Sequence, residues 1–238
     1  MVWALSLAAL AGCASTERLT VLKDPDDAQI PVVLFAPGDA LERDWQKFDV
    51  WQNTTFDLVA EGEDVAIRAR AEGASGLLAR RVDIDPTTCP ILEWQWVIEA
   101  LPTEADLSSR RSEDMAAALF VAFGDPGIFT NPDPVPTLRY VWSTETNGVD
   151  EVVDSPYFSG MIRSLPVRSG PAGIGSFTQE RRNILSDYQL AFGELPQDDI
   201  EVIALFIDSD HGKDPLEARF LGGRVLCSEA PEEPSIFD

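Results

Sequence analysis

The sequence predicts a mainly β protein that folds as a two-layer β-sandwich with one packed helix. Short runs of alternating apolar and polar residues recur along the chain, and clusters of Gly, Pro and Asp separate them. Two continuous apolar runs, at 115–124 and 200–208, are typical of central strands buried on both faces. With 238 residues, 45% of them hydrophobic, the chain is long enough for one domain with a sizeable core.

The first 12 residues resemble the signal peptide of a bacterial lipoprotein. The segment "LSLAALAGCAS" is apolar, ends in small residues and is too short to span a bilayer. Leu10, Ala11, Gly12 and Cys13 match a lipobox, which implies cleavage before Cys13 and lipidation of that residue. Residues 1–10 carry no Lys or Arg, unlike the usual signal. The alternative is an ordinary buried N-terminal segment with a chance cysteine.

Residues 13–30 are polar and lack a sustained period, so we expect them to form a lipidated tether. No aspartate follows the lipidated position, where Ala14 and Ser15 stand. This resembles lipoproteins that are sent to the outer membrane, so the predicted location is periplasmic, lipid-anchored and at the outer membrane.

The predicted sandwich domain covers residues 31–228. Its early strands are "PVVLF", "TTFDLV", "VAIRARA" and "GLLARRVDI", with an acidic, glycine-containing turn at 61–64. The next strand, "LEWQWVIEA", alternates strictly, which places Leu92, Trp94, Trp96 and Ile98 on one face. Because two aliphatic residues share this face, we interpret the tryptophans as core residues and not as a platform for a ligand.

The later strands follow the same reasoning. The segment "LRYVWST" alternates, so Tyr140 and Trp142 share a face. The last strand is "RFLGGRVLC", in which Gly222 and Gly223 predict a bulge or a bend. Residues 229–238 form a predicted acidic C-terminal tail.

One segment is predicted to be helical, near 178–192. Ser176 and Gln179 have the spacing of a capping box, and Gly193 is placed to end the helix. Leu185, Tyr188 and Phe192 form the apolar stripe that should pack on a sheet.

Six motifs in this order resemble a bacterial envelope family, domain-of-unknown-function family 3047. They are "SGLLARRVDIDP", "CPILEWQWVIEALP", "SEDMAAALFVAFG", "LRYVWST", "RRNILSDYQLAFGELP" and "VIALFIDSD", and the resemblance covers most of residues 45–228. It implies a β-sandwich similar to galactose-binding-like or carbohydrate-binding jelly rolls, and it implies no established activity.

The charge of the chain limits its partners. With 18 Lys and Arg against 41 Asp and Glu, the formal net charge is −23 and the sequence pI is near 4.2. Nucleic acids and anionic membrane surfaces should be repelled, so contact with a membrane is expected only through the lipid anchor. Neutral or cationic ligands fit better, although acidity also serves solubility alone.

The predicted ligand contacts lie at one edge of the sandwich. Tyr140 and Trp142 run toward the polar loop "STETNGVDE", where their rings could stack on a sugar. Asp208 and Asp210 end a buried strand, and paired carboxylates of this kind can bind Ca²⁺ together with other oxygen ligands. The alternative is a turn in which both aspartates accept hydrogen bonds from backbone amides. Asp114 and Arg182 complete the candidate set, although Asp114 could simply pair with Arg110 or Arg111.

Catalytic patterns are weak. His211 is the only histidine, and Ser75 does not lie in a Gly-x-Ser-x-Gly turn. A polysaccharide-lyase mechanism would need a base and a charge neutraliser, for which Tyr140 or Tyr188 with Arg182 and His211 are the candidates. We therefore expect non-catalytic binding of a glycan or another envelope component, with no certain cofactor. The alternatives are a carbohydrate-active enzyme of the lyase type and a structural assembly lipoprotein.

The cysteines predict one disulfide. If Cys13 is lipidated, Cys89 and Cys227 remain as a pair in an oxidising compartment, where thiols are usually bonded. The alternative is two separately buried thiols that behave as small apolar side chains.

Overall fold

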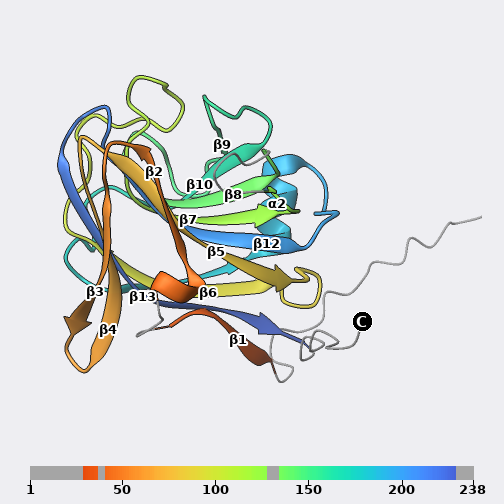
Figure 1. The fold of residues 1–238 in the computed structure, drawn as a ribbon. Coiled ribbons are helices and arrows are strands. Elements are labelled where there is room, and N and C mark those ends of the chain that lie inside the picture. The colour runs from red at the N-terminus through yellow and green to blue at the C-terminus, as the bar shows by residue number, and fades with distance from the viewer. Residues whose placement is uncertain (1–28, 37–40, 128–133, 229–238) are drawn as a thin grey trace, which may run out of the picture.

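The computed structural model describes residues 29–36, 41–127 and 134–228 (Figure 1). The predicted signal peptide at 1–12, Cys13, nearly all of the tether at 13–30 and the tail at 229–238 lie outside the described residues. Among the residues that are described, no helix is long and apolar enough to cross a membrane.

The strands form two sheets, which confirms the predicted two-layer β-sandwich (Figure 1). In sheet A the order is β11-β6-β13-β4-β3, and β1 pairs with the C-terminal part of β13. Its strands are β1 (Ile30–Phe35), β3 (Thr55–Glu61), β4 (Asp64–Glu72), β6 (Ile91–Ile98), β11 (Thr178–Asn183) and β13 (Pro215–Cys227).

In sheet B the order is β2-β5-β12-β7-β8-β10-β9. The pairing of β8 with β10 is parallel, and the other pairings of this sheet are antiparallel. Its strands are β2 (Gln46–Trp51), β5 (Ser75–Ile84), β7 (Met115–Phe123), β8 (Thr137–Ser143), β9 (Val153–Asp154), β10 (Ile162–Ser169) and β12 (Ile200–Asp208). The helices are α1 (Leu41–Asp44) and α2 (Ile184–Phe192).

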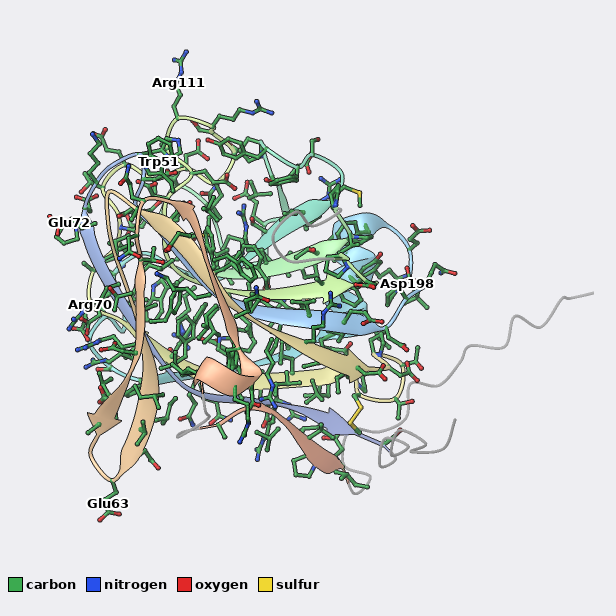
Figure 2. All side chains as sticks on the ribbon, viewed as in Figure 1. Trp51, Glu63, Arg70, Glu72, Arg111 and Asp198 are labelled. Carbon is green, nitrogen blue, oxygen red and sulfur yellow. A yellow bond between two sulfur atoms is a disulfide. The ribbon has the colours of Figure 1, made fainter. Side chains whose placement is uncertain are left out.

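Side chains from both sheets fill the space between them (Figure 2). Trp94 and Trp96 of β6 are fully buried, which confirms that they belong to the core. The ring centroids of Trp94 and Tyr140 are 5.2 Å apart, and those of Trp96 and Trp142 are 6.2 Å apart. Because these contacts cross from one sheet to the other, the aromatic pairs hold the two layers together.

The predicted contact of Tyr140 and Trp142 with a ligand is wrong. Both residues are 0% exposed, and every residue of β8 is buried. The reason is that β8 lies between β7 and β10, not at an edge, and its rings point at the opposite sheet. Their polar atoms are satisfied internally: Tyr140 Oη donates to Asp187 Oδ2 at 3.0 Å, and Trp142 Nε1 donates to Gly170 O at 3.1 Å.

The predicted helix begins six residues later than expected. Residues 178–183 form β11, which pairs antiparallel with β6, and Asn183 caps α2 by accepting a hydrogen bond from Ser186 N at 3.0 Å. The edge of β6 offers β11 a row of backbone partners, and this pairing prevails over the capping pattern at Ser176. The helix ends at Gly193 as predicted, with φ at 83°.

The C-terminal strand carries two features that the sequence predicts. Its pairing with β6 changes register between Phe220 and Gly222, which is the expected bulge. A Cβ atom on Gly223 would lie 2.2 Å from Phe35 Cε1, so this position has no room for a side chain. Cys227 forms the predicted disulfide with Cys89, which joins the end of β13 to the turn before β6.

Candidate functional site

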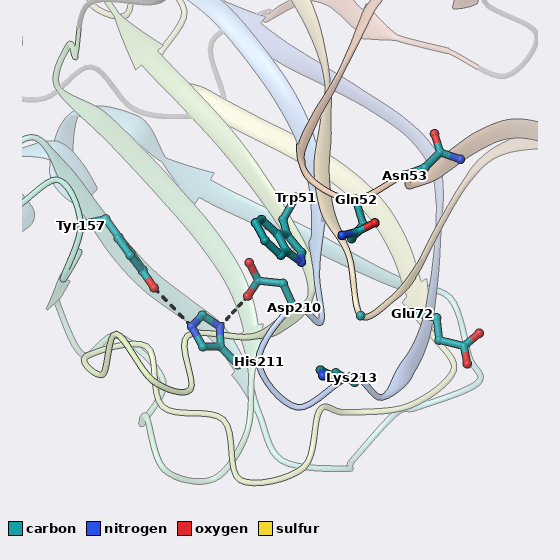
Figure 3. A pocket seen from close by; sticks show the side chains of 9 residues that line it. Trp51, Gln52, Asn53, Glu72, Tyr157, Asp210, His211 and Lys213 are labelled. Carbon is teal, nitrogen blue, oxygen red and sulfur yellow. Dashed lines mark hydrogen bonds and ion pairs between the residues drawn. The ribbon is translucent and has the colours of Figure 1, made fainter.

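An open pocket of about 840 Å³ lies at one end of sheet B. The strand register builds this end, because Trp51 of β2 and Asp208 of β12 both pair with Ser75 of β5, and Met115 of β7 pairs with Asp208. The end of β2, the turn after β12 and the residues before β7 therefore meet (Figure 3). The pocket is lined by Trp51, Gln52, Asn53, Glu72, Gly73, Tyr157, Asp210, His211 and Lys213.

The turn between β2 and β3 fixes the backbone that carries Trp51. Asp49 Oδ1 accepts hydrogen bonds from Thr54 N at 2.8 Å and Thr54 Oγ1 at 2.7 Å. Gly76 lies against this turn, where a Cβ atom would be 2.3 Å from Thr54 Oγ1. The turn is thus tightly held, while the Trp51 side chain remains 56% exposed to solvent.

The turn after β12 is held from both sides. Ser209 N donates to Ala74 O at 2.9 Å, and Gly73 N donates to Ser209 Oγ at 3.1 Å. Asp114 accepts from His211 N at 3.1 Å and from Gly212 N at 2.6 Å. Asp114 therefore orients the turn that presents Asp210 and His211 to the pocket, and it does not form the alternative pair with a neighbouring arginine.

His211 links three segments of the chain. Its Nδ1 lies 2.5 Å from Asp210 Oδ1 and 3.3 Å from Asp114 Oδ1, and its Nε2 lies 3.3 Å from Tyr157 Oη (Figure 3). Tyr157 Oη also donates to Arg110 O at 2.8 Å, and the Arg110 guanidinium lies 5.3 Å from the centre of the Tyr157 ring. Tyr157 is half-exposed, so it forms one wall of the pocket.

Burial and neighbouring carboxylates raise the pKa values of Asp208 and Tyr157 on this side of the pocket. Asp208 is 8% exposed, and burial together with Asp210, Asp114 and Glu113 raises its pKa to about 9. At neutral pH the Asp208 carboxyl is therefore protonated. Burial and the charges of Asp210, Glu113 and Asp208 also raise the pKa of the Tyr157 hydroxyl. The tyrosine is then neutral at pH 7 and is poorly suited to act as a base.

Asp114, Asp210 and His211 could hold a metal ion, since their donor atoms lie within 4.8 Å of one another. Two carboxylates with one imidazole nitrogen suit a transition metal better than Ca²⁺, which takes oxygen ligands. The sequence paired Asp208 with Asp210 as the Ca²⁺ ligands. In the structure Asp208 is not part of this group, and its Oδ1 accepts a hydrogen bond from Asp210 N at 3.1 Å.

The structure brings together three of the candidate residues that the sequence selected, Asp114, Asp208 and Asp210. Arg182 is elsewhere: its Nη2 lies 2.7 Å from Asp187 Oδ1, and its Nη1 lies 2.8 Å from Asp150 Oδ1. This ion pair shares Asp187 with Tyr140 beside α2, so Arg182 is part of a structural network and its predicted ligand contact is not supported.

Sequence reasoning selected Asp210 and His211 but missed most of the residues that line the pocket, above all Trp51 and Tyr157. The one signal for Trp51 is the segment "WQN", in which an aromatic residue is followed by two amides at the end of a strand. Tyr157 carries no such signal, because its role depends on the contact with His211, 54 residues further along the chain.

The profile of the family described as Protein of unknown function (DUF3047) matches residues 43–222. No curated protein sequence matches the chain. Among solved structures, the family 11 carbohydrate-binding module of the cellulase Lic26A-Cel5E of Clostridium thermocellum is 8% identical, with a TM-score of 0.46 over 87% of this chain and 99% of that one. The xyloglucanase domain of NopAA from Sinorhizobium fredii, in complex with cellobiose, is 8% identical, with a TM-score of 0.45 over 76% and 93%.

Proposed function

The chain belongs to the family described as Protein of unknown function (DUF3047), and we propose that it binds a glycan at the pocket beside Trp51 without catalysing a reaction. The observation that carries this proposal is the exposed indole of Trp51, held at the edge of an open, polar pocket. An exposed indole that lines a polar pocket offers the kind of apolar face on which a sugar ring can stack.

The residues around Trp51 suit a sugar ring. The apolar C–H face of a pyranose can stack on an indole, and its hydroxyl groups need donors and acceptors at the rim. Gln52 and Asn53 follow Trp51 directly and line the same pocket, and each amide offers both a donor and an acceptor. The pocket is thus apolar on one face and polar around it, which matches the two faces of a saccharide.

The lyase alternative is less well supported. Tyr140 is fully buried, and burial with the charge of Asp187 raises the pKa of its hydroxyl well above the usual value. Tyr157 does contact His211, but its hydroxyl is also neutral at pH 7 and donates to Arg110 O. A chain of net charge −23 would in addition repel the acidic polysaccharides on which such lyases act.

The assembly alternative predicts one large exposed apolar patch. The large hydrophobic side chains that are exposed in the described part of the chain are spread over many elements, including Val33 of β1, Leu58 of β3, Leu190 of α2 and Phe177 before β11. This distribution favours a binding role over an assembly role.

We further propose that the protein is an envelope lipoprotein anchored through Cys13, with the sandwich facing the periplasm at the outer membrane. The lipobox-like segment before Cys13 supports the anchor. The disulfide between Cys89 and Cys227 supports an oxidising compartment, because such bonds are rare in the bacterial cytosol.

A glycan array followed by calorimetric titration tests the proposed function. The wild-type protein should bind at least one glycan, and Trp51→Ala should weaken that binding by about 5- to 150-fold, because a stacked aromatic side chain contributes about 1–3 kcal/mol. Phe177→Ala is the matched control, since Phe177 is an exposed aromatic residue that does not line the pocket. If Trp51→Ala binds as tightly as the wild type, the pocket is not the binding site.

A further inference from the structure

The carboxylate of Asp210 offers a ligand an unused acceptor. Its Oδ1 faces His211 Nδ1 at 2.5 Å, while its Oδ2 accepts no hydrogen bond from any residue that the structure describes. The side chain is 23% exposed and lines the pocket together with Trp51. In Figure 3 the Asp210 carboxylate and the Trp51 indole project into the same hollow. An anionic oxygen is therefore open beside an aromatic face.

The cations near this carboxylate already have partners. Arg139 forms a buried ion pair with Glu113, so the two charges cancel. Arg110 keeps its positive charge, because its partner at 2.5 Å, Pro156 O, is a neutral carbonyl. His211 lies between the carboxylates of Asp114 and Asp210. Two carboxylates, Asp114 and Asp210, thus stand against Arg110 and His211. The net charge of these four groups is −1 with a neutral imidazole and zero with a protonated one, so they do not repel a cation.

The opposite side of the pocket does not change this balance. Lys213 and Glu72 both line it there, and their charges are opposite and equal (Figure 3). Over a longer range, the net charge of −23 draws cations toward the protein and repels anions. A positively charged ligand is therefore favoured both by the groups that line the pocket and by the net charge of the whole protein.

We propose that the pocket prefers an amino sugar, whose protonated amine donates to Asp210 Oδ2 while its ring stacks on Trp51. This inference rests on the proposed function, because it names the kind of glycan that the same pocket takes. A hydrogen bond from an ammonium group to a carboxylate is stronger than one from a hydroxyl group. The indole next to the carboxylate also attracts a cation through its π-face.

Two β-1,4-linked tetrasaccharides test the preference directly, because cellotetraose and the tetramer of glucosamine differ only in a hydroxyl or an amine at carbon 2. We expect the wild-type protein to bind the glucosamine tetramer about tenfold more tightly by calorimetry at pH 6, in low salt and with EDTA to remove metal ions. The preference should shrink as salt is added, since ions screen exposed charges.

Asp210→Asn identifies the group that recognises the amine. It removes the charge and keeps the backbone N–H that donates to Asp208. The preference should fall from about tenfold to about onefold, while affinity for cellotetraose changes by no more than about twofold. Glu63→Gln is the control, because it removes the same charge at the tip of the β3–β4 hairpin, at the opposite end of the molecule from Trp51 (Figure 2).

The outcomes separate the two proposals. If array glycans bind but the two tetrasaccharides bind equally, or neither binds, the amine preference is wrong and glycan binding stands. If no glycan binds at all, the proposed function fails and the preference fails with it. A preference that persists in a folded Asp210→Asn variant also overturns the inference. Should that variant not fold, Lys213→Gln replaces it: removing the opposing cation must increase the preference, and an unchanged or reduced preference refutes it.

Discussion

Removal of the Cys89–Cys227 disulfide should cost the protein a large part of its stability. The bridge joins two residues that are 138 positions apart in the sequence. It therefore keeps these two positions together in the unfolded chain and lowers the conformational entropy of that state. For a loop of this length the chain-entropy model gives about 5 kcal/mol at 25 °C, and measured values often fall below it. We therefore expect Cys89→Ala combined with Cys227→Ala to lower the free energy of unfolding by about 3–5 kcal/mol.

Urea unfolding followed by tryptophan fluorescence measures this loss. With a slope of about 3 kcal/mol per molar urea, the midpoint should fall by about 1–1.7 M. Both cysteines are buried, so the substitutions also remove packing contacts. The wild-type protein with its disulfide reduced separates the two effects, because it keeps both sulfur atoms.

If chain entropy is the main cause, the reduced wild type and the double variant should unfold at nearly the same urea concentration. A reduced wild type that stays within about 0.3 M of the oxidised protein would refute the reasoning. The lost stability of the variant would then come from packing around Cys89 and Cys227.

Three further predictions follow from single positions. Cys13→Ser should move the protein from the membrane fraction to the soluble fraction or leave its precursor uncleaved, and full membrane partitioning on fractionation would contradict the anchor. In the folded protein Asp208 keeps its proton up to its pKa of about 9, whereas in the unfolded chain it loses the proton above about pH 4. The free energy of unfolding should therefore fall as pH rises between these values. Urea midpoints measured at pH 5, 7 and 9 should show this fall in the wild type and a smaller one in Asp208→Asn. If the two proteins lose stability in parallel, Asp208 is not the cause. Gly76→Ala should destabilise the fold by about 1–3 kcal/mol in the same assay, because its Cβ would lie 2.3 Å from Thr54 Oγ1, and an unchanged midpoint would mean that the turn below Trp51 is looser than it looks.

The sequence predicts a strand and its buried face well where residue types alternate because one face packs in the core. Trp94 and Trp96 are in the core as expected, because two aliphatic residues share their face and a sandwich buries one face of each strand. The helix was predicted too early, at 178, because local capping residues do not reveal that β6 has an unpaired edge. That edge is a property of the assembled sheet.

The candidate site was predicted in part, and the errors share a cause. Tyr140 and Trp142 alternate as edge-strand residues would, and only the order of the sheet shows that β8 is central and buried on both faces. The sequence does indicate Asp208 and Asp210, because an Asp-x-Asp pair at the end of an apolar strand is a local pattern. Trp51 and Tyr157 were missed because the contacts that define them join distant parts of the chain.

The most direct test of glycan binding at this pocket is the nuclear magnetic resonance signal of the tryptophan indole N–H groups. The indole of Trp51 is exposed, whereas Trp45, Trp94, Trp96 and Trp142 are buried in the core. Titration with the glycan that binds most tightly in the array should shift the Trp51 signal, assigned with Trp51→Phe, and leave the signals of the four buried tryptophans in place. A Trp51 signal that stays unchanged while the protein becomes saturated with the glycan would contradict binding at this pocket.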